Sequence, residues 1–149
     1  MNWNENKSVR LSQVCVVVFA ALLLLLDAFC YAAVRWFTAV RGMPWSTGKR
    51  MMITIYLCSV FGWALLWKLW RLLRNIRSQV VFDAKNVALL RSVSWCCVGA
   101  GVICLASSFY YLPFSAVAIA AGFMALIVRI VKNVFEQAIL MKDDLDLTI

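Results

Sequence analysis

The sequence contains no histidine, and only 15% of its 149 residues are charged. A soluble globular domain has about 25% charged residues, so this composition does not suit one. Histidine is also the commonest metal ligand and the usual general base near neutral pH. Mechanisms that depend on an imidazole are therefore excluded.

The chain also lacks a C-x-x-C pair, the arrangement typical of thiol oxidoreductases and many zinc sites. Its six cysteines all lie in apolar segments, where cysteine acts as a small packing residue. We therefore expect no catalytic residue, no metal site and no cofactor, and we predict that the protein is not an enzyme.

What the chain has in abundance is apolar sequence, at 64% hydrophobic residues and a mean hydropathy of +0.85. Four apolar segments are long enough to cross a hydrocarbon core of about 30 Å. They cover about residues 11–34, 51–73, 92–112 and 115–134. The first is too long for the apolar region of a signal peptide. We predict one all-α domain, a polytopic membrane protein with four transmembrane helices.

The longest polar interruption runs from Lys68 to Arg91 and carries six of the fifteen basic residues. Basic loops resist translocation, so the connection 74–91 is expected in the cytoplasm. That orientation places both termini and the tail 135–149 inside, with eleven basic residues inside and four outside. We therefore predict a bacterial cytoplasmic membrane protein. The four basic residues expected outside, which count against this orientation, lie in Arg35–Arg50. Gly42, Pro44 and Gly48 indicate a loop there.

The last two segments are separated by an uncharged Tyr-Leu-Pro-Phe turn, which predicts a tight antiparallel hairpin. Small residues at 96–101 are expected to face the fourth segment. There, Ala118 and Gly122, like Ala121 and Ala125, have the spacing that lets helices approach closely in lipid. Self-association through the same faces is an alternative.

Asp27 is the one acidic residue inside an apolar segment, and such a group is a functional candidate because burying it costs free energy. Its position about 24 Å along the first span places it off the midplane. Tyr31, one turn further, could hydrogen-bond the carboxylate, and Arg35 or Arg41 could reach back to it. A structural pairing and a proton or ion site both remain open.

The connection contains the start of a helix, with Asp83 as its N-cap and Val80, Val81 and Phe82 as an apolar contact beside it. We select Phe82, Asp83, Asn86, Leu90 and Arg91 as candidate interaction residues. The alternative is a plain linker whose basic side chains are attracted to anionic membrane lipids.

The tail concentrates three of the seven acidic residues in its last eight positions. It is expected on the same side of the membrane as the basic connection, so it could dock against it or form a solvated end. The candidate interaction residues of the tail are Asp143, Asp144, Asp146, Leu147, Thr148 and Ile149.

These two elements together, Phe82-Asp83-x-x-Asn86-x-x-x-Leu90-Arg91 and the Asp146-Leu147-Thr148-Ile149 ending, resemble a bacterial family of small four-span membrane proteins, the YoaS-like domain of unknown function. The resemblance covers about residues 50–149. It implies no established activity. It also implies a small helix-turn-helix regulator as a candidate partner, because such a regulator is often encoded beside family members.

The function predicted from these features is that of a non-enzymatic, membrane-anchored interaction or regulatory protein. It would act through its cytoplasmic face on a soluble protein partner, with no direct contact to nucleic acid. A small transporter or a peptide-immunity protein that uses Asp27 is the alternative.

Overall fold

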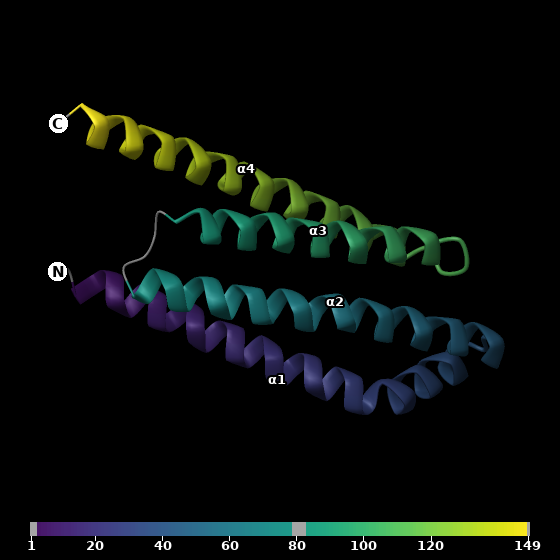
Figure 1. Ribbon diagram of the computed structural model, residues 1–149. Helices are drawn as coiled ribbons and strands as arrows, with labels where there is room; N and C mark the ends of the chain where they lie inside the picture. Colours follow the sequence, from purple (N-terminus) through teal and green to yellow (C-terminus); the bar gives the residue numbers. More distant parts are fainter. Residues whose placement is uncertain (1–2, 79–82, 149) are drawn as a thin grey trace.

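The computed structural model describes residues 3–78 and 83–148 (Figure 1). All regular structure in these two ranges is α-helical, which confirms the predicted fold class. The four helices of this part of the chain are α1 (Trp3–Val40), α2 (Trp45–Arg77), α3 (Ala84–Ser107) and α4 (Phe114–Leu147). Each contains a stretch that is long and apolar enough to span a membrane.

The helices run antiparallel and lie side by side in chain order (Figure 1). Within the described ranges, backbone contacts between helices join α1 to α2, α2 to α3 and α3 to α4 only. Whereas a closed bundle would bring α1 against α4, this arrangement is an open row. Both termini lie at one end, which we call the connection end, and the short links after α1 and α3 lie at the other, the turn end.

The link between α1 and α2 is shorter than the expected loop over 35–50 and comprises residues 41–44. Gly42 adopts a φ of +62°, a conformation that side chains with a Cβ rarely accept. Gly48 lies inside α2, and a Cβ there would come within 3.1 Å of Thr38 and Trp45 side-chain atoms. This glycine therefore allows close packing of α1 and α2, and does not interrupt the helix.

The turn end is held by an apolar cluster that joins α1, α2 and the α3–α4 turn. Its buried members are Cys30, Val34 and Met51, and Tyr110 and Tyr111 of the turn pack against them. The turn therefore fastens the α3–α4 hairpin to the first two helices.

The α3–α4 hairpin is packed through small residues, as the sequence predicted. Ala118 and Ala125 are buried, and a Cβ on Gly101 would lie 3.5 Å from the Ala118 carbonyl oxygen. A Cβ on Gly122 would meet no atom within 4 Å, so this glycine is not needed for the close approach. Gly99, expected to face α4, instead lies against Phe61 of α2.

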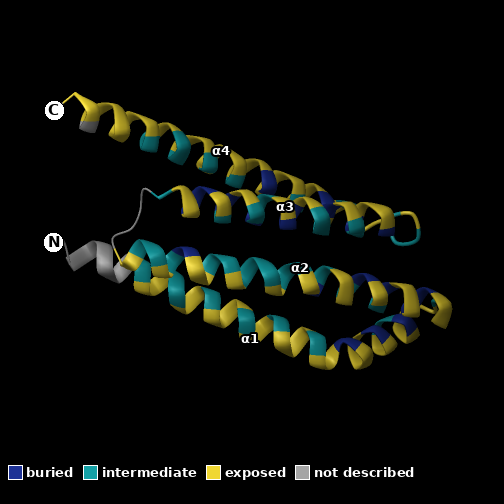
Figure 2. Cartoon of the chain, in the orientation of Figure 1, coloured by how far each residue is buried: buried dark blue, intermediate teal, exposed yellow. Residues whose placement is uncertain are grey.

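The outward faces of the row are apolar and exposed (Figure 2). Large side chains such as Phe19, Val60 and Ile119 are more than half exposed along the helices. Soluble monomers rarely expose continuous apolar patches above a few hundred Å². These faces are suited to lipid, and the chain is a multi-pass membrane protein.

Candidate functional site

The start of α3 at the connection end is capped as predicted. The Asp83 carboxylate accepts a hydrogen bond from the backbone N–H of Lys85 at 3.0 Å, which confirms Asp83 as the N-cap. Phe82, together with the predicted apolar contact at 80–81, lies outside the described residues. The cap fixes the point at which the chain enters the third span.

Asn86 and Leu90, two of the candidate interaction residues, are buried packing residues. Asn86 is 0% exposed, and its side-chain oxygen accepts a hydrogen bond from Nδ2 of Asn75 on α2 at 2.8 Å. Leu90, one turn further, is also buried. A buried amide must be hydrogen-bonded because losing that bond is costly. These residues therefore join α3 to its neighbours and are not accessible to a partner.

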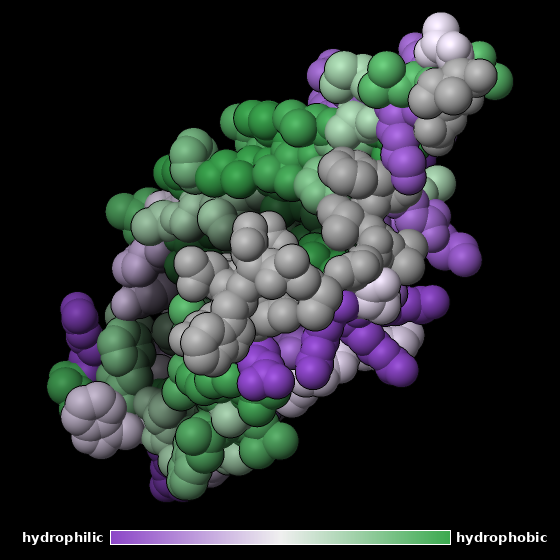
Figure 3. Space-filling model, turned by 90° about the vertical axis from the view of Figure 1, so that its left-hand side faces the viewer, coloured by the Kyte–Doolittle hydropathy of each residue, from purple (hydrophilic) through white to green (hydrophobic). Residues whose placement is uncertain are grey.

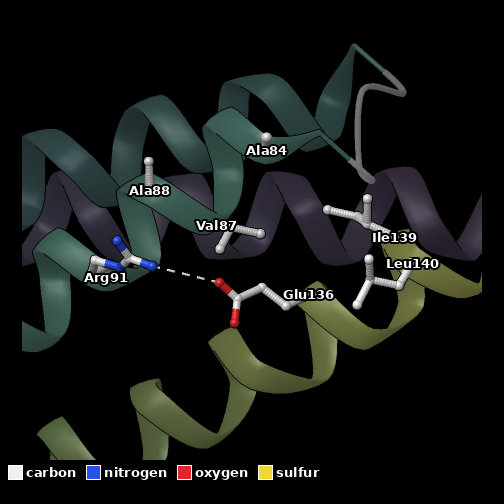
Figure 4. A pocket seen from close by; sticks show the side chains of 7 residues that line it. All are labelled: Ala84, Val87, Ala88, Arg91, Glu136, Ile139 and Leu140. Carbon is white, nitrogen blue, oxygen red and sulfur yellow. Dashed lines mark ion pairs between the residues drawn. The ribbon is translucent and has the colours of Figure 1, made fainter. Parts of the chain in front are cut away.

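Arg91 lies at the surface, where it forms an ion pair across α3 and α4. Its Nη2 lies 3.6 Å from Oε1 of Glu136 (Figure 4). The other carboxylate oxygen, Oε2, lies 2.8 Å from Nζ of Lys132. A groove of about 490 Å³ opens beside this pair. The rest of its lining is apolar, from Val87 and two alanines of α3 and from Ile139 and Leu140 of α4.

The acidic tail is the continuation of α4, which leans away from α3 at the connection end (Figure 1). Asp143 and Asp144 are exposed, and neither forms an ion pair with the basic connection in the described part of the chain. The Thr148 hydroxyl donates to the Asp144 carbonyl at 2.7 Å and closes the helix. Leu147 is exposed, while the Asp146 side chain and Ile149 lie outside the description.

Asp27 is paired with α2. Its Oδ2 accepts hydrogen bonds from the Ser59 hydroxyl at 2.6 Å and from Nε1 of Trp63 at 3.0 Å. Its Oδ1 is buried without a hydrogen-bond partner. The structure does not bring Tyr31 to the carboxylate, because the Tyr31 hydroxyl accepts from Arg35 at 3.4 Å. Asp27 therefore links α1 to α2.

The partners of this aspartate are not among the residues that the sequence singled out. Ser59 and Trp63 are four residues apart and share one face of α2, which is visible in the sequence. Which helix that face would meet is not visible there. Glu136 and Asn75 were missed for the same reason, since each pairs with a residue on another helix.

Residues 8–149 match a family described as a protein of unknown function (DUF2975). The chain belongs to this family. The match confirms the prediction of a family of unknown function. It also covers the first helix, whereas the resemblance predicted from the sequence covered only about residues 50–149. Searches of curated proteins and of solved structures found no match.

For this DUF2975 protein, the connection end gathers most of the polar side chains outside the spans. Figure 3 looks onto this end and shows hydrophilic side chains concentrated along one side of it. Among the described residues, no group of three or more cysteine or acidic side chains could hold a metal ion. The charged side chains at the connection end are suited to forming ion pairs and hydrogen bonds.

Proposed function

We propose that this DUF2975 protein is a non-enzymatic membrane protein that binds a soluble protein partner at its connection end. It would reside in a bacterial cytoplasmic membrane with both termini in the cytoplasm. The observation that carries the proposal is the exposed last part of α4, which is both apolar and acidic.

The length of α4 supports the proposal of a protein-binding site at the connection end. Its 34 residues extend about 51 Å, whereas a hydrocarbon core is about 30 Å thick. About 20 Å of helix therefore projects beyond the core. Leu140 and Leu147 are both more than 60% exposed on this projection. Exposed apolar residues on a helix in water indicate a binding face.

The side of α4 that faces the groove indicates the chemistry of the partner. Glu136, Leu140, Asp143 and Leu147 recur every three or four residues and so share one face. Asp143 and Asp144 have no ion-pair partner in the described residues, so that face attracts positive charge. An amphipathic helix with apolar and basic residues fits this face in the helix-in-groove mode. A small helix-turn-helix regulator, the partner that the resemblance implies, is the first protein to test.

Site-specific photo-crosslinking tests the proposal. A photoreactive residue at Leu140 faces the groove, while one at Leu145 is equally exposed, at 66% against 64%, on another side of α4. We expect crosslinks to one basic soluble protein at position 140 and not at 145. Replacing Asp143 and Asp144 by Asn should weaken them. Equal crosslinking at both positions, or crosslinks to lipid alone, would contradict the proposal.

The cytoplasmic orientation has a separate test. Reporter fusions after Ser78 and after Gly42 end at opposite ends of α2. With eleven of fifteen basic residues expected inside, the fusion at Ser78 should report the cytoplasm and the fusion at Gly42 the outside. The reverse result would place the projecting α4 end outside the cell.

A second candidate function, transport or peptide immunity, is favoured by the buried and unpaired Oδ1 of Asp27. That atom could accept a proton or contact a cation. Proton flux into vesicles containing the purified protein distinguishes the two functions. The docking proposal expects the same flux for wild type and Asp27→Asn, whereas a proton-coupled transporter would lose flux at unchanged protein abundance.

A further inference from the structure

A second groove at the connection end lies between α2 and α3, and its volume is about 510 Å³. Three cationic side chains line it, from Lys68 and Arg71 of α2 and Lys85 of α3. Among the described residues that line it, none is acidic. Asn75 and Ser92 add polar groups, and Trp67 contributes an aromatic ring. The groove is therefore a polar cleft with a concentrated positive charge.

The three cations have no ion-pair partner among the described residues. The two ion pairs found there both use Glu136, which pairs with Arg91 and Lys132 on the other side of α3. Asp83, the nearest acidic residue in sequence to Lys85, is engaged as the N-cap of α3. The positive charge of this groove is thus uncompensated, unlike that of the α3–α4 groove.

The groove lies at the depth of a lipid headgroup. Lys68 is 17 residues beyond Met51, or about 26 Å along α2, close to the edge of a core of about 30 Å. Its ammonium donates a hydrogen bond to the Ser92 hydroxyl, which holds the charge in the groove. Trp67 is mostly exposed beside it, as expected for an indole at a membrane interface.

We propose that this groove binds the phosphate of an anionic phospholipid in the leaflet at the connection end. Lys68, Arg71 and Lys85 supply the charge, and Asn75 and Ser92 supply hydrogen bonds. Basic pockets between transmembrane helices are suited to such headgroups. A phosphatidylcholine headgroup carries its own cation, which the three basic residues repel, so the site selects net negative lipid. The inference concerns a different groove and does not depend on the protein partner.

Native mass spectrometry of the full chain in detergent tests the site, with dioleoyl phosphatidylglycerol and dioleoyl phosphatidylcholine as probes. Each cation near a membrane surface strengthens binding about fivefold, so K68Q/R71Q/K85Q should weaken phosphatidylglycerol binding by about two orders of magnitude. The control R35Q/R41Q/K49Q removes three cations at the turn end. It should leave phosphatidylglycerol binding unchanged.

Single substitutions keep the test valid if the triple variant does not fold. Arg71 and Lys49 are both exposed, and neither makes a side-chain hydrogen bond or ion pair with another described residue. R71Q should weaken phosphatidylglycerol binding about fivefold, and K49Q should have no effect.

Three results would overturn the proposal. Equal loss in the turn-end variants would show a general effect of net charge. Equal binding of phosphatidylcholine would remove the selectivity for anionic lipid. Displacement of phosphatidylglycerol by excess inorganic phosphate would assign the groove to a free anion.

Discussion

The two sides of α3 are held to their neighbours in different ways. On the α2 side, side-chain hydrogen bonds occur along the length of the interface. They join Thr54 to Ser107, Lys68 to Ser92 and Asn75 to Asn86. On the α4 side the contact is made by small residues, with Gly101 near the Ala118 backbone and Ala125 buried. Ser94 adds a hydrogen bond to the Ala125 carbonyl.

The two interfaces show two ways of holding helices together inside a membrane. Lipid tails are as apolar as leucine, so the hydrophobic effect does not drive helices together within a bilayer. Close packing of small residues and hydrogen bonds between helices replace it. The α3–α4 hairpin relies mainly on packing, whereas the α2–α3 interface relies on hydrogen bonds that require one register.

The largest expected effect comes from filling the close contact between α3 and α4. In Gly101→Leu the new side chain meets the Ala118 carbonyl, a backbone group that cannot rotate away. We expect the free energy of unfolding in detergent to fall by about 3 kcal/mol. Gly122→Leu is the matched control, because its Cβ would meet open space, and should change stability by less than about 0.5 kcal/mol. Equal losses would show that packing does not hold this hairpin.

The second prediction tests the hydrogen-bonded side of α3. Asn86→Ala removes the acceptor of the Asn75 amide inside the protein and should lower the unfolding free energy by about 2 kcal/mol. Denaturant titration in the same detergent measures it. Asn133→Ala, at an exposed position on α4, is the control and should be neutral. Neutral behaviour of Asn86→Ala would mean that the α2–α3 interface does not depend on this bond.

The third prediction extends the comparison to α1 and α2. Asp27→Leu removes the acceptor for Ser59 and Trp63 and should cost about 1 kcal/mol, since hydrogen bonds between membrane helices contribute modestly. Asp27→Asn keeps an acceptor oxygen and should be close to wild type in the same unfolding assay. A large loss in Asp27→Asn would show that the negative charge itself is required.

The smallest effect is expected at the ion pair across the α3–α4 groove. The side chains of Arg91 and Glu136 are 64% and 41% exposed, so solvent screens their attraction. Arg91→Gln removes this pair and leaves the Lys132–Glu136 pair in place, so it should change stability by a few tenths of a kcal/mol at most. Thermal unfolding at low and high salt measures it, and the small difference should disappear as salt rises. A loss as large as that of Gly101→Leu would reverse the assignment of this interface to packing.

The helices, their order and the common side of both termini could be predicted from the sequence. Hydropathy and charge are properties of segments, so they can be counted along the chain without knowing its partners. The Asp83 cap was predictable for a related reason, because its hydrogen bond reaches only two residues ahead.

The interior face of each helix could not be predicted in the same way. Asn86, Leu90, Val93 and Cys97 recur at helical spacing and are all buried. However, the opposite face of α3 is also apolar, because it meets lipid, so periodicity does not distinguish the two faces. The pairing of Asp27 shows the same limit, since local spacing suggested Tyr31 while the rotation of α2 placed Ser59 and Trp63 beside it.

The continuous α4 has a mechanical consequence. It is held to α3 at Ala118 and Ala125, and its other end at Leu147 is 22 residues beyond Ala125, or about 33 Å along a straight helix. A tilt of only about 5° around Ala125 moves the far end by about 3 Å. Small changes in helix tilt within the bilayer are thus amplified at the acidic end of α4.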